Sequence, residues 1–470
     1  MDTKLLHGIL NPQMVSDDSE TLTRFSVDGI VPKAVVYPTN LSQAAEVIKL
    51  ANKENWAVTP CGGCSKLGIG NVPKRMDLIL NTSRLDKIID IDVANLTVTA
   101  QAGVKLRDLQ DLLGGTENRC YFPLEGDTKA QADYMCSSRE YKGVFLPLDP
   151  SFPDQATVGG IVATNASGPK RLRYGLPRDL VLGVRYVTPT GEIIGMGGKT
   201  VKNVSGYDVS KIMIGSFGTL GIIGDITFRL LPLPEQSVTL LGSFTSLSDA
   251  VCFSRRVLGS KLLPTSVEIL NDAGYELSEF SDLSVSSQSW CVAVGLEGFN
   301  EEITREITDL KDMARLERVV DLRELDREKA SYFWNNLANC AVRALRQGKS
   351  VIKFKAGFLI SHYAEVLESW AELSDGQGAL IASAGSGTAC AYFLGIQQSD
   401  NAKMAKLSSS FRAVTEKHEG SMVVELAPAA MKNELDLWGK PGRDFIIMKR
   451  IKDSVDPLNV LNPGRFLGGI

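Results

Sequence analysis

The order of hydrophobic and polar residues near the start of the chain predicts a strand, a helix and a second strand. Residues 35–37 form a short β-branched run that is typical of a strand. Asn40 followed by Gln43 is typical of a helix N-cap with its reciprocal partner, and apolar residues recur at near-helical spacing over 44–51. Residues 56–58 return to strand character, so we predict one strand-helix-strand unit here.

Strand-like and helical patterns alternate further along the N-terminal half. The run Leu-Ile-Leu at 78–80 and the alternating stretch at 96–100 predict strands, and 106–113 has helical spacing. Residues 116–141 break this pattern because they show no clear periodicity, and they contain two of the eight cysteines. We therefore predict an α+β domain that carries an inserted loop over 116–141.

Closely spaced prolines indicate where the first domain ends. Pro232 and Pro234 disfavour both a continued helix and a central strand, so we predict a first domain over 1–235. Strand-like and helical patterns alternate again beyond it, which predicts a second α+β domain over 236–435. Its pattern is strand-like at 237–244 and 290–296 and helical at 248–258 and 301–316.

Composition and charge exclude some classes of partner. The 470 residues include 51 basic and 55 acidic side chains, and the formal net charge of −4 favours neither nucleic acid nor an anionic membrane. This length suggests two or three domains. The most apolar stretch, 212–234, is interrupted by polar residues and is rich in glycine, so it predicts buried strands and turns rather than a membrane helix.

The N-terminus and the cysteines bear on the cellular compartment. The first residues include an acid and no long apolar core, so they lack the pattern of a secretion signal. Eight cysteines in 470 residues are too sparse for a disulfide scaffold. We therefore expect a cytoplasmic protein with no direct membrane span, held at a membrane only through partners.

Three glycine-rich segments together resemble the FAD-binding domain of the p-cresol methylhydroxylase/vanillyl-alcohol oxidase superfamily. They are the turn at 60–68, the stretch from Leu146 to Gly168, and the stretch from Lys202 to Ile223. Each alone is weak, whereas their order and spacing together are specific. The resemblance implies noncovalent or covalent FAD in a fold of two α+β subdomains followed by an α+β cap domain.

The C-terminal segment and the glycines fit the same resemblance. Residues 456–465 are similar to the family's ending, which implies that 436–470 return to the FAD domain. A pyrophosphate needs converging N–H donors, and glycine removes side chains that would block its approach. Glycine pairs elsewhere let main chain lie against a large planar ring. The residues that the resemblance implies at FAD are Pro60, Cys61, Gly62, Gly63, Cys64, Ser65, Lys66, Pro147, Asp149, Thr157, Gly159, Gly160, Ala163, Thr164, Asn165, Ser167, Gly168, Tyr174, Gly221 and Ile223.

A closer resemblance is to the glycolate oxidase subunits, in particular the FAD-binding GlcE-type subunit, and it rests on residues 169–175 and 436–441. It implies a component of a multi-subunit 2-hydroxy-acid dehydrogenase that accepts or relays electrons through FAD. The implied partners are a catalytic flavin subunit and an iron-sulfur subunit.

The metal ligands of related hydroxy-acid dehydrogenases are missing. Those relatives have a His-Ala-Gly-Asp-Gly-Asn-x-His element and a later Glu-His-Gly element in the second domain. Here Ser383 and Cys390 replace the two imidazoles of the first element, and Leu426 follows Glu425 where the later His would stand. The chain has only three histidines, so we predict no metal site of that kind.

Candidates for substrate chemistry are few. Arg171 and Arg173 could hold a carboxylate, although contact with the FAD phosphates or an exposed position is at least as good an interpretation. His418 could act as a base, although a lone histidine is more often an ordinary surface residue.

The cysteines near the predicted phosphate turn leave two interpretations. Cys64 stands where some relatives have a histidine that bonds covalently to the flavin, so we predict noncovalent FAD. Cys61 and Cys64 together with Cys120 and Cys136 could ligate zinc or an iron-sulfur cluster. The favoured interpretation is small residues that pack a turn and two thiols in a loop.

Three functions follow from these observations. The first is the FAD-carrying subunit of a multi-subunit 2-hydroxy-acid dehydrogenase, which the missing metal ligands favour. The second is a stand-alone FAD-dependent alcohol or hydroxy-acid oxidase that uses Arg and Tyr side chains in place of metal. The third is a flavin-free structural subunit.

Overall fold

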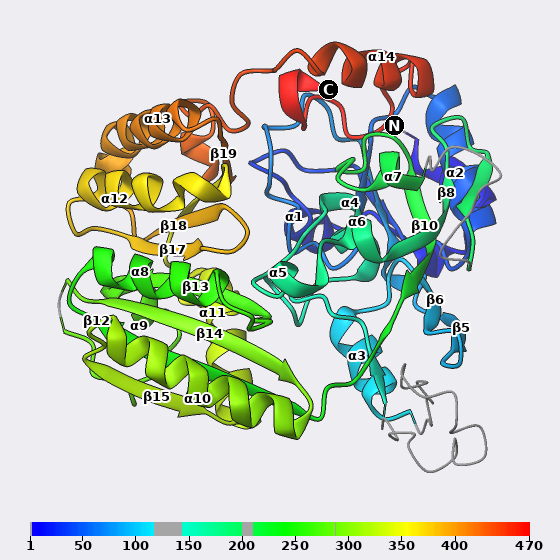
Figure 1. Ribbon diagram of the computed structural model, residues 1–470. Helices are drawn as coiled ribbons and strands as arrows, with labels where there is room; N and C mark the ends of the chain where they lie inside the picture. Colours follow the sequence, from blue (N-terminus) through cyan, green and yellow to red (C-terminus); the bar gives the residue numbers. More distant parts are fainter. Residues whose placement is uncertain (1, 117–142, 200–209, 287) are drawn as a thin grey trace, which may run out of the picture.

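The computed structural model describes residues 2–116, 143–199, 210–286 and 288–470 (Figure 1). Most of the predicted inserted loop at 116–141, with Cys120 and Cys136, lies outside the described residues. So does the predicted motif at 202–208.

The N-terminal unit is a small sheet with one helix crossing between its strands. Its strands lie in the order β1 (Val15–Ser16), β2 (Ala34–Val36), β4 (Leu78–Asn81) and β3 (Val58–Cys61), and the last three are parallel. Helix α2 (Leu41–Lys53) connects β2 to β3, which confirms the predicted strand-helix-strand unit.

The start of α2 differs from the prediction in one detail. The Asn40 side chain accepts a hydrogen bond from the Gln43 backbone N–H at 2.9 Å, as expected of an N-cap. The Gln43 side chain returns to Thr39 and not to Asn40, accepting from its backbone N–H at 2.8 Å and its hydroxyl at 2.9 Å. The reciprocal bond therefore fixes the residue before the cap.

The second sheet is antiparallel and completes the N-terminal part. Its order is β5 (Ile88–Asp92), β6 (Thr97–Gln101), β10 (Ile222–Arg229), β8 (Val181–Val187) and β9 (Ile193–Gly197). The predicted helix at 106–113 is α3 (Leu106–Gly114), and it packs with α4 (Val158–Thr164) in the core of this sheet. The apolar stretch at 212–234 supplies the central strand β10. None of the described helices has the length and apolar character needed to cross a membrane.

An eight-stranded antiparallel sheet forms the C-terminal half, and we call it the cap sheet (Figure 1). One face is covered by α8 (Leu247–Leu258), α10 (Asn300–Leu316), α12 (Tyr363–Ser374) and α13 (Asn401–Lys417). The other face carries α9 (Asp272–Glu276) and α11 (Arg327–Arg346). The strands in order are β15 (Asp321–Leu325), β12 (Gln236–Phe244), β14 (Trp290–Gly298), β13 (Ser266–Asn271), β17 (Ala379–Ser383), β18 (Thr388–Leu394), β16 (Val351–Gly357) and β19 (Ser421–Leu426).

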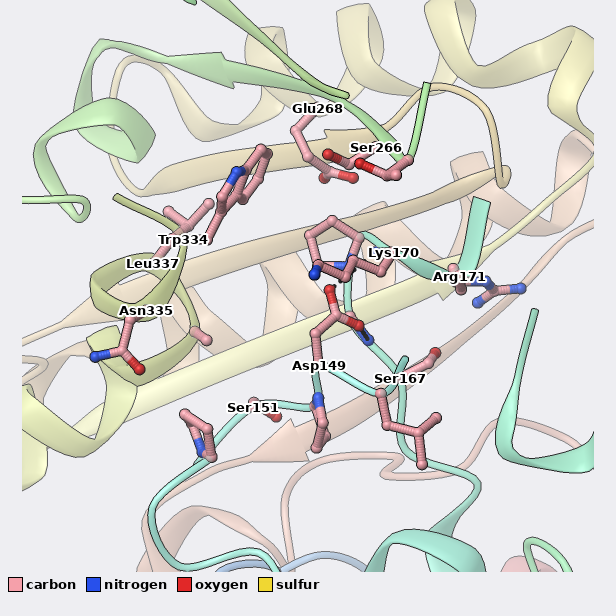
Figure 2. Close-up of a pocket in the computed structure, with 18 of the residues that line it drawn as sticks. Asp149, Ser151, Ser167, Lys170, Arg171, Ser266, Glu268, Trp334, Asn335 and Leu337 are labelled. Carbon is pink, nitrogen blue, oxygen red and sulfur yellow. Dashed lines mark hydrogen bonds between the residues drawn. The ribbon is translucent and has the colours of Figure 1, made fainter. Parts of the chain in front are cut away.

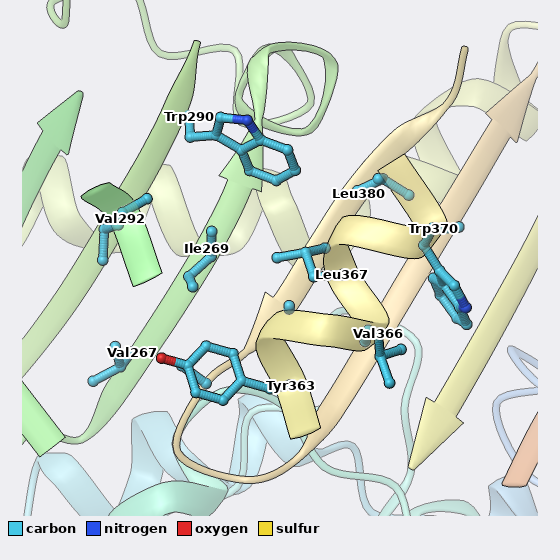
Figure 3. Packing of buried hydrophobic residues seen from close by; sticks show 14 of the residues in the cluster. Val267, Ile269, Trp290, Val292, Tyr363, Val366, Leu367, Trp370 and Leu380 are labelled. Atoms are coloured by element: carbon cyan, nitrogen blue, oxygen red, sulfur yellow. The ribbon is translucent and has the colours of Figure 1, made fainter. Parts of the chain in front are cut away.

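Alternation along the strands sorts the cap sheet's side chains between its two faces. Val267 and Ile269 of β13 belong to the apolar core beneath α12, which Figure 3 shows from close by. Glu268 lies between them in sequence and therefore points to the opposite face. Phe354 of β16 joins the same apolar core, so Lys353 and Lys355 of that strand also point to the opposite face.

The chain returns to the first sheet after the cap sheet. Helix α14 (Phe445–Val455) leads into a segment that runs beside β3. The Val58 N–H donates to the Val460 carbonyl at 2.8 Å, and the Asn462 N–H donates to the Val58 carbonyl at 2.9 Å. Two elements far apart in sequence therefore form one edge of the N-terminal sheet.

A buried ion pair fixes this return. The Lys452 ammonium lies 2.6 Å from the Asp456 carboxylate, and both side chains are almost fully buried. Asp456 also accepts hydrogen bonds from the backbone N–H groups of Val460 and Leu461, each at 2.9 Å.

Replacing Asp456 with Asn should lower the free energy of unfolding by about 3 kcal/mol, because it leaves the buried Lys452 charge without its counter-ion. Urea denaturation followed by circular dichroism measures the change. Asp453→Asn is the matched control, since its pair with Lys449 is exposed and should contribute little. Equal stability of the two variants would contradict the assignment.

Candidate functional site

A glycine-rich turn after β3 forms one wall of a cavity in the N-terminal part, which we call the dinucleotide cavity. The other walls come from α4, from the start of β10 and from the C-terminal segment. The structure thus brings together most residues that the sequence predicts at the cofactor. Those that line this cavity are Pro60, Cys61, Gly62, Gly63, Cys64, Ser65, Lys66, Thr157, Gly159, Gly160, Ala163, Thr164, Gly221 and Ile223.

The glycines of this turn are required by protein packing as well. A Cβ atom at Gly63 would collide with the carbonyl oxygen of Gln155, and one at Gly62 would collide with the Thr157 hydroxyl. The sequence predicted that these positions stay bare for the approach of a pyrophosphate. The structure adds a closer reason, because the turn lies directly against the segment that leads into α4.

Unpartnered polar atoms show that the dinucleotide cavity suits a polar cofactor. Asn462 and Arg465 both line it. Among the described residues, the Asn462 Oδ1 and the Arg465 Nε are buried and have no hydrogen-bond partner. Buried polar groups normally find partners, so a ligand with donors and acceptors fits here. FAD would be held by the glycine-rich turn on one side and by these two residues on the other.

Cys61 and Cys64 form a disulfide within the turn, with their Cα atoms 5.5 Å apart. The Asn81 amide donates to both sulfurs, at 3.7 and 3.9 Å. The favoured interpretation of two unlinked small residues is therefore wrong for this pair, because the sulfurs are bonded to each other. A sulfur in a disulfide is not a thiolate ligand, so the structure gives no support to a metal centre on this pair.

A second cavity of about 410 Å³ lies between the N-terminal part and the cap sheet, and we call it the cap cavity (Figure 2). Its walls come from the segment after β7 (Val144–Phe145), from β13, β16, β17 and β18, and from α11. Lys66 lines both cavities, so they meet at the glycine-rich turn.

Asp149 holds the floor of the cap cavity. Its carboxylate accepts hydrogen bonds from the backbone N–H of Gly168 at 3.0 Å and of Lys170 at 2.8 Å. Burial raises the pKa of Asp149 to about 6, although these two hydrogen bonds oppose the rise. Asp149, Ser167 and Gly168 were predicted at the cofactor, and the structure places them in the cap cavity (Figure 2).

Glu297 of β14 ties the cap sheet to the loop and short helix that follow α4. Its carboxylate receives the Lys170 ammonium at 2.7 Å and the Tyr174 hydroxyl at 2.8 Å. The Arg173 guanidinium donates to the Glu297 carbonyl at 2.6 Å. Tyr174 and Arg173 therefore act in this contact between the two halves, and neither lines the two described cavities.

A lysine cluster lies on the cap-sheet face of the cap cavity. Glu425 receives the Lys353 ammonium at 2.6 Å and the Lys355 ammonium at 3.2 Å. Burial opposes ionisation of Glu425, yet these two charges hold its pKa well below its usual range. Burial lowers the pKa of Lys66 to about 7; the Glu425 carboxylate opposes this shift, and Lys355 and Lys353 lower the pKa further.

Glu268 faces the same cavity from β13 (Figure 2). Its side chain is buried, and one oxygen accepts from the Ser383 hydroxyl at 2.8 Å. The other oxygen has no hydrogen-bond partner among the described residues. Burial raises the pKa of Glu268 to about 8; the Ser383 hydrogen bond opposes the shift, the Asp149 charge adds to it, and the Arg171 charge lowers the pKa. Glu268 is therefore mainly a neutral carboxylic acid at pH 7.

The remaining predicted site residues are dispersed. Arg171 lines the cap cavity. His418 follows α13 and lies beside the ring of His362, with 5.1 Å between their centroids, away from both cavities. Pro147 and Asn165 also line neither of the two described cavities, and Asn165 ends α4 in the left-handed conformation.

The positions of the relatives' metal ligands lie within the lysine and Glu268 region. Ser383 pairs with Glu268 across the strands, and Cys390 pairs with Lys355. Over the residues that the structure describes, no group of three or more His, Cys, Asp or Glu side chains could hold a metal ion. The retained Glu425 is instead paired with two ammonium groups.

One sequence signal for this region was missed. Lys353 and Lys355 flank Phe354 in a strand-like run, and alternation places two such lysines on the face opposite a buried phenylalanine. Lysine is rarely buried without a partner, so a pair on the inner side of a strand indicates a charged site. The contribution of Asn462 and Arg465 had no comparable local signal.

Family models match nearly the whole chain. The model of the FAD binding domain matches residues 32–125 and 138–209, and the model of the C-terminal domain of FAD linked oxidases matches residues 233–466. The two matches meet between the N-terminal sheets and the cap sheet.

Relatives with similar sequences are flavin-linked enzymes of hydroxy acids. Glycolate oxidase subunit GlcD of Bacillus subtilis is 26% identical over 93% of this chain and 89% of its own length. The mitochondrial cytochrome-linked D-lactate dehydrogenase of Arabidopsis thaliana is 24% identical over 93% of this chain and 74% of its own. Since the glycolate oxidase relative is GlcD, the closer likeness to the GlcE-type subunit stays a prediction.

Solved structures share the fold. p-Cresol methylhydroxylase with substrate bound superposes with a TM-score of 0.70 at 16% identity, covering 98% of this chain and 95% of that one. Alkyldihydroxyacetonephosphate synthase gives a TM-score of 0.71 at 17% identity, covering 98% and 84%. These likenesses confirm the predicted arrangement of an FAD-binding α+β domain followed by an α+β cap domain.

Proposed function

Because the chain belongs to the p-cresol methylhydroxylase-type family of FAD-linked oxidases, we propose that it is the FAD-binding subunit of a multi-subunit 2-hydroxy-acid dehydrogenase of the glycolate or lactate type. The chain is an FAD-dependent oxidoreductase related to glycolate oxidase GlcD and to D-lactate dehydrogenases. In the proposed complex it accepts or relays electrons beside a catalytic flavin subunit and an iron-sulfur subunit. We expect this complex in the cytoplasm, with any membrane attachment supplied by partners.

One observation carries this proposal: ammonium groups occupy the surroundings of the retained Glu425. Ser383, Cys390 and Leu426 supply no imidazole, and Lys353 holds Glu425 at 2.6 Å. A divalent cation would have to displace that lysine and would then find too few ligands. Metal-assisted oxidation of a hydroxy acid is therefore not supported in this chain, which favours a separate catalytic subunit.

The chain's own residues would hold FAD and exclude water from it. When bound, FAD supplies acceptance of two electrons as a hydride or singly. The glycine-rich turn and α4 would contact the cofactor from one side, and Asn462 and Arg465 from the other. Lys66 lies where the two cavities meet, so its ammonium group would stand between the cofactor and any ligand in the cap cavity.

A stand-alone oxidase is the second candidate, and the cap cavity favours it. A cavity of about 410 Å³ beside the dinucleotide cavity is large enough for a small substrate, and Arg171 lines it. In that case the isolated chain would be active without partners. The flavin-free alternative is set aside, because FAD binding is shown by the family.

Purification of the tagged chain from its native host tests the proposal. We expect two further chains to copurify, and we expect the complex to contain flavin together with iron and acid-labile sulfide. A homogeneous chain that alone turns over 2-hydroxy acids at catalytic rates would overturn the proposal in favour of the stand-alone oxidase.

The flavin should be released by acid precipitation of the purified chain. Cys64 stands where some relatives have the histidine that bonds to the flavin, and its sulfur is engaged with Cys61. The measurement is the visible absorbance of the supernatant against that of the pellet. Yellow colour retained in the washed pellet would show a covalent link and would contradict this prediction.

A further inference from the structure

The charges that line the cap cavity are strongly unequal in number. Seven of the lining side chains are basic and three are acidic. The acidic residues are Asp149, Glu268 and Glu297. The basic residues are Lys66, Arg107, Lys170, Arg171, Arg327, Lys353 and Lys355.

Several of these charges are already balanced by protein groups. Lys170 is paired with Glu297 at 2.7 Å, and Arg107 is paired with Asp154 at 2.8 Å. Arg327 donates to backbone carbonyls. These groups therefore account for the structure of the walls and leave the other cations to be explained.

The remaining cations exceed the carboxylates that face them. Lys353 and Lys355 share the single carboxylate of Glu425. Lys66 and Arg171 form no side-chain hydrogen bond or ion pair with the described residues, although Lys66 lies close enough to the lysines for their charges to depress its pKa. A buried excess of positive charge is unfavourable unless an anion balances it.

Glu268 adds a hydrogen-bonding group to the same cavity. It is 2% exposed, and its Oε1 has no partner among the described residues. Burial raises the pKa of Glu268 to about 8, so at pH 7 it faces the cavity mainly as a neutral acid. A protonated carboxyl group donates one hydrogen bond and accepts others, and therefore does not repel an anion.

We infer that the cap cavity is a binding site for a small organic carboxylate, which Lys353, Lys355 and Lys66 attract and to which Glu268 offers a hydrogen bond. The lysine cluster provides positive charge in the region where relatives hold a metal ion. The inference goes beyond the proposed function, because a subunit that only relays electrons needs no such site. It requires neither partner subunits nor turnover.

Isothermal titration of the purified FAD-loaded chain with glutarate tests the site. Glutarate has two carboxylates and no hydroxyl group, so it reports binding without oxidation. We expect saturable binding of glutarate and at least about tenfold weaker binding of its neutral diamide, glutaramide. No detectable glutarate binding up to about 10 mM, or equal binding of the diamide, would overturn the inference.

Lys355→Met is the variant that assigns the site to the lysine cluster. Lys355 is partly exposed, and Glu425 keeps Lys353, so the fold should tolerate the change. We expect the affinity for glutarate to fall at least about tenfold. Lys349→Met, on an exposed lysine just before β16, is the matched control and should bind as the unmodified chain does.

The results separate this inference from the proposed function. Glutarate binding that is unchanged in the folded Lys355→Met chain would overturn the assignment to the lysine cluster, whatever copurifies with the protein. Conversely, a failure to find partner subunits would leave the titration result standing. The melting temperature of each variant establishes that it is folded before binding is measured.

Discussion

Purified Gly63→Val chain should be nearly colourless while its cap sheet remains folded. The Val side chain cannot be accommodated by a rotamer change, because its Cβ atom already collides with the Gln155 carbonyl oxygen. The turn must move away from the segment that leads into α4, and it then no longer forms a wall of the dinucleotide cavity. We expect FAD occupancy to fall at least about tenfold.

The ratio of flavin absorbance to protein concentration measures this loss, and circular dichroism reports the fold. Gly68→Ala is the matched control, because a Cβ atom there meets nothing within 4 Å and the residue belongs to the same loop. It should bind FAD as the unmodified chain does. Full occupancy in Gly63→Val would show that this turn does not shape the cofactor site.

Glycolate or D-lactate should reduce the flavin of the isolated chain at least about a thousandfold more slowly than the flavin of the assembled complex. A metal that holds both hydroxyl and carboxylate is worth several kcal/mol at the transition state, and about 1.4 kcal/mol corresponds to a tenfold change in rate. This chain lacks that anchor, because Ser383, Cys390 and Leu426 offer no imidazole. Lys353 already occupies Glu425.

Stopped-flow mixing under anaerobic conditions, with flavin bleaching as the signal, measures both rates. Adding Zn²⁺ or Mn²⁺ to the isolated chain should leave its rate unchanged, whereas adding the partner subunits should raise it. Rapid bleaching in the isolated chain would contradict the electron-relay role. Arg171, Lys66 and Glu268 would then be the residues to replace first, since all three line the cap cavity.

Binding and oxidation are separate properties in these predictions. A carboxylate held by Lys353 and Lys355 has no base that the structure places beside its hydroxyl, and Glu268 is mainly protonated at pH 7. The cap cavity can therefore bind an organic anion tightly without oxidising it quickly. A positive glutarate titration together with slow flavin bleaching is the combined result that we expect.

The sequence by itself determined the fold class and the cofactor. Strand and helix periods are local, so the unit at 35–58 and the segments 237–244 and 301–316 could be predicted from neighbouring residues. The glycine-rich segments identified FAD because a turn that only small residues can make leaves a recognisable run of letters. The missing imidazoles were equally readable, since an absent side chain needs no structure to be noticed.

Only the tertiary structure decided which side chains meet in the cavities. Glu268 and Ser383 are far apart in sequence and become neighbours through the pairing of β13 with β17. Lys66 reaches the lysines of β16 because the two halves of the molecule face each other across the cap cavity. Such contacts depend on strand register and on how the halves pack, and neither leaves a periodic signal in the sequence.

The reason for the glycines also came from packing. The sequence assigned Gly62 and Gly63 to the approach of a cofactor, whereas the structure places Gln155 and Thr157 directly against them. Likewise, Asn462 reaches the dinucleotide cavity only because the C-terminal segment runs beside β3. A residue's own neighbours in sequence fix its local conformation, but the contact that makes it necessary is set by chain segments hundreds of residues away.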